Sequence, residues 1–435
     1  LDLILSGWRA DSELARLNQA ASLRVSPELY AVVEAAEAWR AHSGGAFDGR
    51  LGHMEALWRG AENAPPSADR LLETASAARL GPVGLDPAAS LVSRPEGALF
   101  ALDGLAKGYV IDAALAAGRR AAPDLQGLMV DIGGDLRVWG RSPDGAGWKI
   151  GAADPSRPED NAAPGAMIRI GSGAVATSGR GGRDLQIGGR RYPSLLVPAT
   201  GEAACGVVSA TAFAPRAVDA DALATALTVL PPEEGLALTE RTPGAAALIV
   251  DADGRRHASA GWTRLADLPP PRLIRAAAPQ AAAGPAWPAG FAVMVDYELP
   301  RINERRVYAP YVSIWITDEN NSAVRQLLLL GDNANYIDQN YVWWRRVGRS
   351  LPGGADAVSK PTRPAGKYTA VWDGKDNNGR PVGQGTYTVH LEATREHGGH
   401  SYQTVQVEIG AQPAEAAAAA SDELGGTKVR YGKRT

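Results

Sequence analysis

A run of small residues and prolines divides the chain into two parts. Residues 276–290 read AAAPQAAAGPAWPAG, a composition typical of a linker rather than of a packed element. Before this run, helix-like and strand-like patterns alternate. After it, β-branched and aromatic runs such as 311–316 and 386–391 are separated by turn residues. We therefore expect a mixed α and β domain at 1–270, a linker at 271–290, an all-β domain at 291–412, and an Ala-rich tail at 413–435 in which 428–431 could form a returning strand.

Composition and charge exclude several classes of protein. Hydrophobic residues make up 45% and charged residues 21% of the 435 residues, so each part can bury a core. The 45 basic and 48 acidic side chains give a net charge of −3, which disfavours a nucleic-acid binder. A single cysteine, Cys205, excludes an internal disulfide framework and a multi-cysteine zinc site.

The first residues resemble the interior of a domain rather than its start. The chain begins with Leu1 instead of Met, and residues 1–8 read like the end of an amphipathic segment. No secretory signal is visible, and no run approaches the 18 or so apolar residues of a membrane span. We expect an N-terminally truncated domain, with a membrane tether left open for the missing part.

Asp221 and Thr225 are spaced four residues apart in the predicted helix 219–230. That spacing places a carboxylate and a hydroxyl on one face, one turn apart. Oxygen ligands of this kind suit Mg²⁺, which usually completes its shell with waters and substrate phosphates. The alternative is structural, because an acidic residue near a helix start also caps it and complements its dipole.

Three glycine-containing segments could approach a nucleotide closely. Lys107 lies in the segment 104–108 (GLAKG) at the start of a predicted helix, where backbone N–H groups and a lysine can bind phosphate. Residues 131–135 (DIGGD) end a predicted buried strand, and residues 176–179 (ATSG) form a small polar loop. Each segment taken alone is equally compatible with an ordinary turn.

Together these segments identify a family far more specifically than any one of them, because their order and their sequences resemble the ApbE family of FAD:protein FMN transferases. The match is collinear over nearly all of 1–270 and comprises 11–14 (DSEL), Asn18, 43–48 (SGGAFD), 104–109 (GLAKGY), 131–136 (DIGGDL), 176–179 (ATSG), 198–201 (PATG), 219–226 (DADALATA) and 259–262 (SAGW). The resemblance predicts an α+β flavin transferase domain.

The resemblance also implies an activity and a set of site residues. Family members bind FAD with Mg²⁺ and transfer FMN to a Ser or Thr of a target protein, releasing AMP, which is a phosphotransfer reaction. By position, Asp221 and Thr225 would be catalytic metal ligands, with the Ala106 carbonyl as a third. The FAD site would comprise Lys107, Asp131, Gly133, Gly134, Asp135, Thr177, Ser178 and Gly179, and Asp48 would support the pocket.

The chain departs from the family pattern at several positions. The family typically has a histidine, and an acid three residues later, just before the Pro-x-Thr-Gly motif, where this chain has Ser194 and Val197. Residues 49–50 are Gly-Arg instead of the usual Pro-Thr, Arg180 follows the ATSG motif, and residues 103–104 are Asp-Gly. The missing histidine bears on transfer more than on FAD binding.

The C-terminal part resembles an Ig-like β-sandwich of exported proteins and a domain of unknown function in predicted periplasmic proteins. The relevant segments are 310–315 (PYVSIW), 343–345 (WWR), 368–374 (YTAVWDG) and 385–389 (GTYTV). The two resemblances together imply a periplasmic location, or one at the periplasmic face of the inner membrane, and the ApbE resemblance implies a target flavoprotein as partner. Two alternatives stay open: a flavin-binding protein that has lost transfer, and a two-domain adhesion or scaffold module.

Overall fold

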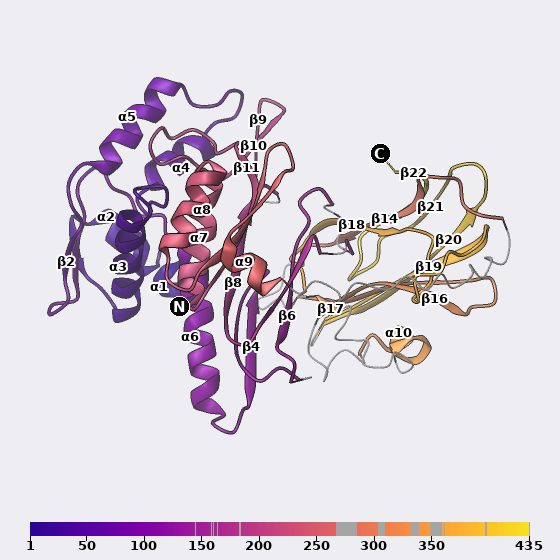
Figure 1. Cartoon of the computed structure of the whole chain (residues 1–435). Coiled ribbons are helices and arrows are strands. Elements are labelled where there is room, and N and C mark those ends of the chain that lie inside the picture. The colour runs from indigo at the N-terminus through magenta and orange to yellow at the C-terminus, as the bar shows by residue number, and fades with distance from the viewer. Residues whose placement is uncertain are drawn as a thin grey trace. The chain divides into compact units, whose positions relative to one another are not determined.

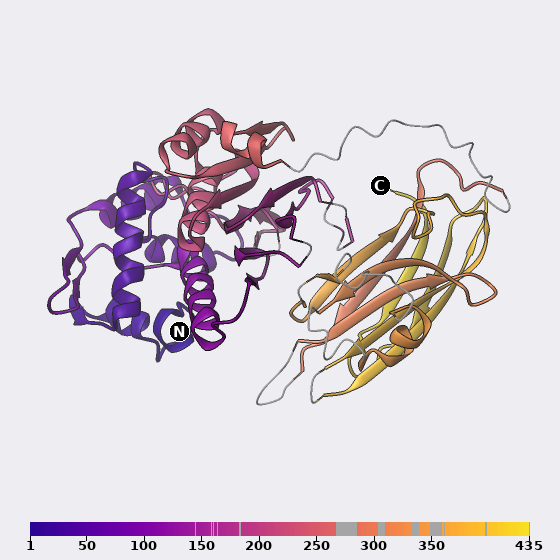
Figure 2. The same cartoon turned by 60° about the horizontal axis from the view of Figure 1, so that its bottom comes forward.

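The chain forms two compact units, each described here by itself (Figures 1 and 2). The computed structural model describes residues 1–143, 145–157, 159, 161–162, 164–181, 184–266, 285–302, 309–331, 339–348, 359–360, 362–395 and 398–434. Unit 1 comprises 1–156 and 164–268, and unit 2 comprises 157–163 and 269–435. Most of the linker expected at 271–290 lies outside the described residues.

Helix α3 (Pro27–His42) starts at a recognisable cap. Ser26 precedes α3, accepts a hydrogen bond from the Leu29 N–H, and is followed by Pro27 at the first helical position. Gly44, with φ +64°, lies just beyond the end of α3. The helices are α1 (Asp2–Leu5), α2 (Glu13–Gln19), α3 (Pro27–His42), α4 (Gly52–Arg59), α5 (Ala68–Arg79), α6 (Asp103–Ala121), α7 (Ala217–Val229), α8 (Pro232–Arg241) and α9 (Ala260–Leu265).

A six-stranded antiparallel sheet forms the centre of unit 1, in the order β13-β12-β11-β8-β5-β4. Its strands are β4 (Gly127–Ile132), β5 (Asp135–Gly140), β8 (Gly173–Gly179), β11 (Val207–Ala214), β12 (Ala246–Asp251) and β13 (Arg256–Ala258). Helices α6 and α7 pack against one face of this sheet (Figure 1). Its other face packs against β6 (Trp148–Ala152), β7 (Ala166–Ile170) and α9.

Helix α7 packs closely because its buried side chains are small. It lies against α6 and against strands β8 and β11. Its alanines at 217, 220, 222, 224 and 226 are each 2% exposed or less. A helix lined by alanine lets neighbouring backbones approach, which fixes the position of the other residues that it carries.

Short strands complete unit 1 away from the main sheet. One small sheet has the order β1-β3-β2, and β9 and β10 form a separate pair. Their bounds are β1 (Ser22–Arg24), β2 (Gly84–Asp86), β3 (Leu91–Ser93), β9 (Leu185–Ile187) and β10 (Arg190–Tyr192).

Unit 2 is a β-sandwich whose two sheets share one apolar core. The four-stranded sheet has the order β18-β14-β22-β21, and the five-stranded sheet has the order β17-β16-β15-β19-β20. Their bounds are β14 (Phe291–Leu299), β15 (Tyr311–Thr317), β16 (Ala323–Leu330), β17 (Ser359–Lys360), β18 (Gly366–Trp372), β19 (Gly385–Thr394), β20 (His400–Ile409), β21 (Ala414–Ala418) and β22 (Thr427–Lys433). The two-part fold class, α+β followed by all-β, is confirmed.

The C-terminal residues, expected as a tail at 413–435, form two strands of the sandwich. The Ala-rich segment set apart at 413–435 forms β21, and β22 inserts between β14 and β21 within the four-stranded sheet. Val429 and Tyr431 of β22 are buried in the sandwich core. The repeated alanines concealed this strand, because alanine has low β propensity when read alone. Among the described residues, no helix is long and apolar enough to cross a membrane.

Candidate functional site

Two glycines of α6 let this helix contact α7 at the candidate site. A Cβ at Gly108 would lie 2.2 Å from the Ala217 carbonyl oxygen, so only glycine permits this approach. At the same contact, the Gly108 N–H donates to the Asp221 Oδ2 at 2.9 Å. Asp221 is 4% exposed. The family-like segment 104–108 is therefore a helix–helix contact as well as a candidate nucleotide contact.

Oxygen atoms gather where α6, α7 and β8 meet. The Thr225 hydroxyl donates to the Gly104 carbonyl at 3.2 Å and lies 3.3 Å from the Ser178 hydroxyl. Ala106 lies between Gly104 and Gly108 on α6, so the three predicted metal ligands occur within one helix–helix contact. The structure thus brings together residues that are more than 100 positions apart in the sequence.

Asp135 connects the helix layer to the sheet beside this oxygen cluster. Its carboxylate is buried, lies 2.5 Å from the Lys107 Nζ, and accepts a hydrogen bond from the Thr177 backbone N–H at 3.0 Å. Lys107 keeps 27% of its side chain exposed. A lysine anchored in this way presents a positive charge at the site with little freedom to move.

Gly133 and Gly134 form the turn between β4 and β5. Their φ angles are +63° and +92°, which suits a two-residue hairpin turn of type I′. The Asp131 carboxylate accepts a hydrogen bond from the Gly134 N–H at 2.9 Å. A Cβ at either glycine would meet nothing within 4 Å, so the outer side of the turn is open space.

Two predicted FAD contacts lie on the sheet face that is turned away from α6 and α7. Side chains alternate along a strand, so Thr177 and Asp131 point opposite to Ser178 and Asp135. The Thr177 hydroxyl contacts the Thr211 hydroxyl at 3.0 Å. Gly179 has a structural reason to be glycine, since its Cβ would lie 2.4 Å from the Val208 carbonyl. Their predicted FAD contacts remain predictions.

Asp112 is a positioning residue that the sequence analysis missed. From α6 it accepts hydrogen bonds from the backbone N–H groups of Ala217 at 2.9 Å and Val218 at 3.1 Å, and it pairs with Arg137 at 2.7 Å. It thereby caps α7 from a neighbouring helix. A sequence pattern reveals caps that are local in the chain, and this one is 105 residues away.

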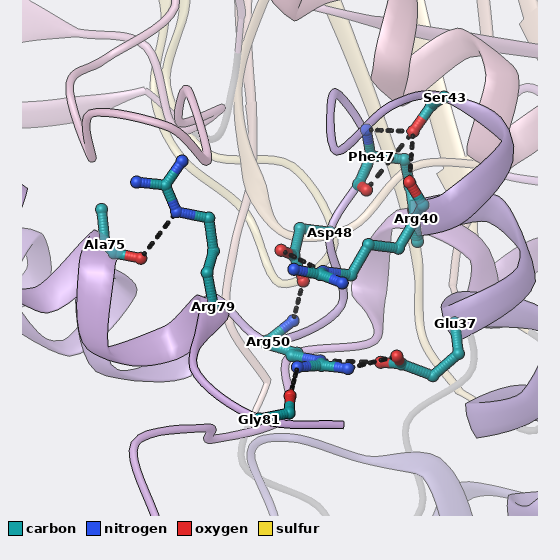
Figure 3. A network of polar contacts seen from close by, with 9 residues as sticks. All are labelled: Glu37, Arg40, Ser43, Phe47, Asp48, Arg50, Ala75, Arg79 and Gly81. Carbon is teal, nitrogen blue, oxygen red and sulfur yellow. Dashed lines mark hydrogen bonds and ion pairs between the residues drawn. The ribbon is translucent and has the colours of Figure 1, made fainter. Parts of the chain in front are cut away.

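The segment 43–50 forms a polar network behind the site (Figure 3). The Ser43 hydroxyl accepts from the Phe47 N–H at 2.9 Å, and Asp48 accepts from the Arg40 Nε and the Arg50 N–H, each at 2.9 Å. Burial raises the pKa of the Asp48 carboxyl, although the Arg40 guanidinium opposes this. The network seats Phe47 against the site, where a Cβ at Gly104 would lie 3.1 Å from its ring.

Arg50, one of the departures from the family pattern, has its own partners. It is 2% exposed, forms an ion pair with Glu37, and donates to the Gly81 carbonyl at 2.9 Å (Figure 3). A buried guanidinium needs such partners to offset its desolvation. Unit 1 thus supplies the partners that offset the burial of this arginine. Ser194, the other main departure, is half-buried after β10.

The donor set fits a magnesium ion. It combines the Asp221 carboxylate, the Thr225 hydroxyl and an α6 carbonyl, all hard oxygen ligands. Within the part of the chain that the structure describes, no group of three or more His, Cys, Asp or Glu could hold a metal. A site with one acidic ligand leaves room for waters and for substrate phosphates.

Known families match both parts of the chain. Residues 1–249 match the ApbE family model, and residues 292–426 match that of a predicted periplasmic protein family, DUF2271. The FAD:protein FMN transferase of Treponema pallidum is 34% identical over 281 residues, covering 60% of this chain and 76% of the relative. The Vibrio cholerae FAD:protein FMN transferase is 32% identical, covering 57% and 75%.

Solved structures give the same result. The ApbE protein of Thermotoga maritima has a TM-score of 0.54 and 32% identity, covering 60% of this chain and 85% of that one. The flavinyl transferase ApbE of Pseudomonas stutzeri has a TM-score of 0.53 and 29% identity, covering 62% and 85%. The predicted family and enzyme class are confirmed: the chain belongs to the ApbE family of flavin transferases.

Proposed function

We propose that this chain transfers FMN from FAD to the hydroxyl of a Ser or Thr in a target protein, with Mg²⁺, and releases AMP. The observation that carries the proposal is the oxygen cluster of Asp221, Thr225 and Ser178 beside the anchored Lys107. Curated relatives that are 34% and 32% identical to this chain are named FAD:protein FMN transferases. Residues 1–270 would carry this activity.

The reaction is the attack of a hydroxyl oxygen on a phosphorus of the FAD pyrophosphate. A new O–P bond forms to FMN, the bond from phosphorus to the bridging oxygen breaks, the hydroxyl loses its proton, and AMP leaves. Mg²⁺ would be held by Asp221, Thr225 and the Ala106 carbonyl, and it would neutralise charge on the diphosphate. Lys107 would donate to a phosphate oxygen, and Asp135 would fix the lysine in position.

The second domain supports a proposal for the location and the partner. Unit 2 contains the match to a predicted periplasmic protein family, which supports a periplasmic setting. We propose that the target is a flavoprotein in that compartment and that unit 2, which contains the all-β domain expected at 291–412, docks or tethers the enzyme there. A membrane tether upstream of residue 1 belongs to the same proposal.

The proposal is tested with the full chain, FAD, MgCl₂ and a protein that bears a Ser or Thr flavinylation site. After denaturation, we expect covalent flavin on the acceptor and one AMP for each flavin, both abolished by EDTA. Thr225→Val keeps the shape of the side chain and removes the hydroxyl, so it should reduce transfer. Transfer that is insensitive to EDTA and to this variant would refute the assigned site.

Ser194 favours a second candidate, a protein that binds FAD without transferring FMN. Family members typically have histidine where this chain has Ser194, and a histidine suits proton transfer at neutral pH. This candidate predicts bound FAD, no covalent flavin on any acceptor, and transfer restored by Ser194→His. Transfer by the unaltered chain would instead show that Ser194 suffices.

A further inference from the structure

Strand β4 is an edge strand of the central sheet, and Asp131 is its one charged residue. It pairs with β5 on one side, and no other strand of the described residues pairs with it. Its sequence, GLMVDI, has no proline and no lysine, the residues that commonly shield an edge from other strands. Met129 and Ile132 are each 37% exposed.

The register shows which backbone groups this edge offers. Ile132 and Asp135 flank a two-residue turn, so they form a hydrogen-bonded pair. Along an antiparallel strand such pairs alternate with residues whose N–H and C=O point the other way. Leu128 and Val130 therefore face β5 through their backbone, whereas Met129 directs its N–H and C=O to the open side.

The open edge begins near a positive surface and ends at the candidate site. Its last residue, Ile132, precedes the turn to Asp135, the partner of Lys107. At the other end, Leu128 pairs with Trp139, and the Arg119 guanidinium stacks on that ring at 3.9 Å. A cavity of about 400 Å³ adjoins this end and is lined in part by Arg119, Arg120 and Trp139.

We infer that β4 is the docking edge for the acceptor protein, a step that rests on the proposed function. An extended segment of the acceptor adds as a strand beside β4, bonded through the outward N–H and C=O of Met129. Its Ser or Thr lies at the turn, next to Lys107 and Asp135. About 20 Å away, the length of six strand residues, an acidic side chain of the acceptor pairs with Arg119 or Arg120.

Three observations select an acceptor polypeptide as the occupant. An unpaired strand edge offers alternating donors and acceptors that another strand matches. The edge runs directly into the site at which a protein hydroxyl must arrive. The two arginines in the last turn of α6 have no carboxylate partner among the described residues, so they can attract an acidic segment.

The test compares Met129→Pro with Met129→Leu in the full chain. Proline removes the outward N–H, and an edge strand tolerates proline when its N–H faces solvent. We expect kcat/KM for the acceptor protein to fall about tenfold or more in Met129→Pro, with the affinity for FAD unchanged. Leucine keeps the N–H, so Met129→Leu should transfer like the unaltered chain. Equal transfer by both variants would overturn the inference.

Hydrogen exchange separates this inference from the proposed function. Adding the acceptor should slow exchange of the peptide 127–132 in the unaltered chain and not in Met129→Pro. Slowed exchange without any transfer would leave the docking edge standing and remove the proposed activity. Transfer without slowed exchange would remove the docking edge and leave the activity.

Charge reversal at the far end supplies an independent readout. Arg120→Glu should raise the KM for the acceptor several-fold, leave kcat unchanged, and reduce the salt dependence of KM. Arg24→Glu makes the same change at an exposed position on β1 and serves as the control. A KM that responds equally to both variants would assign the effect to net charge and overturn the role of Arg120.

Discussion

Glu392 of unit 2 and Asp221 of unit 1 are both buried and both accept a backbone N–H, but their other neighbours differ. In unit 2, Glu392 is fully buried and accepts hydrogen bonds from the Val342 N–H at 3.0 Å, the Trp343 N–H at 2.7 Å and the His400 Nε2 at 2.7 Å. In unit 1, the Asp221 carboxylate lies one helical turn from the Thr225 hydroxyl, which itself contacts further oxygens.

We propose that this difference distinguishes a carboxylate that stabilises the fold from one that can bind a cation. N–H donors already neutralise much of the charge of a buried carboxylate, so it has little affinity left for a cation. Hydroxyl and carbonyl oxygens beside a carboxylate do the opposite, because their lone pairs suit a hard cation. The neighbours of a buried acid therefore indicate its role better than its burial does.

The comparison is tested by changing each of the two acids to its amide, and the largest effect is expected at Asp221. Asp221→Asn keeps an oxygen that accepts from the Gly108 N–H but removes the negative charge. We expect transfer to fall on the order of 100-fold or more, at or beyond the loss caused by removing a supporting partner of a metal ligand. The free energy of unfolding, measured with urea, should change by less than about 1 kcal/mol. Unchanged transfer would contradict the metal assignment.

His390 predicts a pH response confined to unit 2. Its ring is 2% exposed and lies between the Thr317 hydroxyl at 2.9 Å and the Tyr402 hydroxyl at 2.7 Å. Burial, with a smaller effect of Arg346, lowers its pKa from 6.5 to about 4. Between these two pKa values the folded state therefore binds fewer protons than the unfolded state. The free energy of unfolding of unit 2 falls as the pH falls through this range.

Each pKa unit corresponds to about 1.4 kcal/mol, so the loss from His390 between about pH 7 and pH 4 is about 3 kcal/mol. Hydrogen exchange of peptides from β19 and β20 measures it locally, because two units need not unfold together. His390→Gln should flatten this part of the pH profile. A profile of the same steepness in the variant would assign the acid sensitivity to other groups.

Glu392→Gln is the matched change in unit 2 and should cost stability rather than activity. An amide has one oxygen, so at least one of the buried donors around it loses its acceptor, at about 1–3 kcal/mol. We expect faster exchange in β19 and α10 (Tyr341–Arg346) with transfer unaltered. Loss of transfer with stability preserved would mean that unit 2 takes part in the reaction.

Gly104→Ala sharpens the comparison with the smallest effect. The added Cβ would lie 3.1 Å from the Phe47 ring and 3.2 Å from the Thr225 Cγ2, so both must shift by a few tenths of an ångström. We expect transfer to fall a few-fold, because side chains around a catalytic group must stay close to their productive geometry. The thermal unfolding midpoint should stay nearly constant, and a large decrease in it would mark Gly104 as a packing residue instead.

The sequence predicted the family, the two-part fold and the segments that meet at the site. Motifs carry this information because each needs specific residues, such as the glycines at 104 and 108, which let α6 contact α7 and the segment 43–48. It did not predict that Thr177 and Asp131 lie on the other sheet face, since a motif gives an order and not a direction. Asp112 was missed because its partners are distant in the chain.

The unit 2 strands teach the complementary lesson. β22 (Thr427–Lys433) confirms the returning strand predicted at 428–431, whereas β21 was concealed by alanines with no strand pattern of their own. Their pairing with β14 and with each other supplies the order that their side chains do not encode. Tertiary context of this kind is absent from a single sequence.

The alanine-lined helix α7 limits how this enzyme can diverge. Five of its buried positions hold alanine, the smallest residue with a Cβ, so nearly every substitution at these five enlarges a side chain and displaces α6 or the sheet. Such a displacement would reach Asp221 and Thr225, which share that helix. Variation that adapts the protein to new acceptors is therefore expected at its periphery, while the helix that carries these two residues stays nearly invariant over evolutionary time.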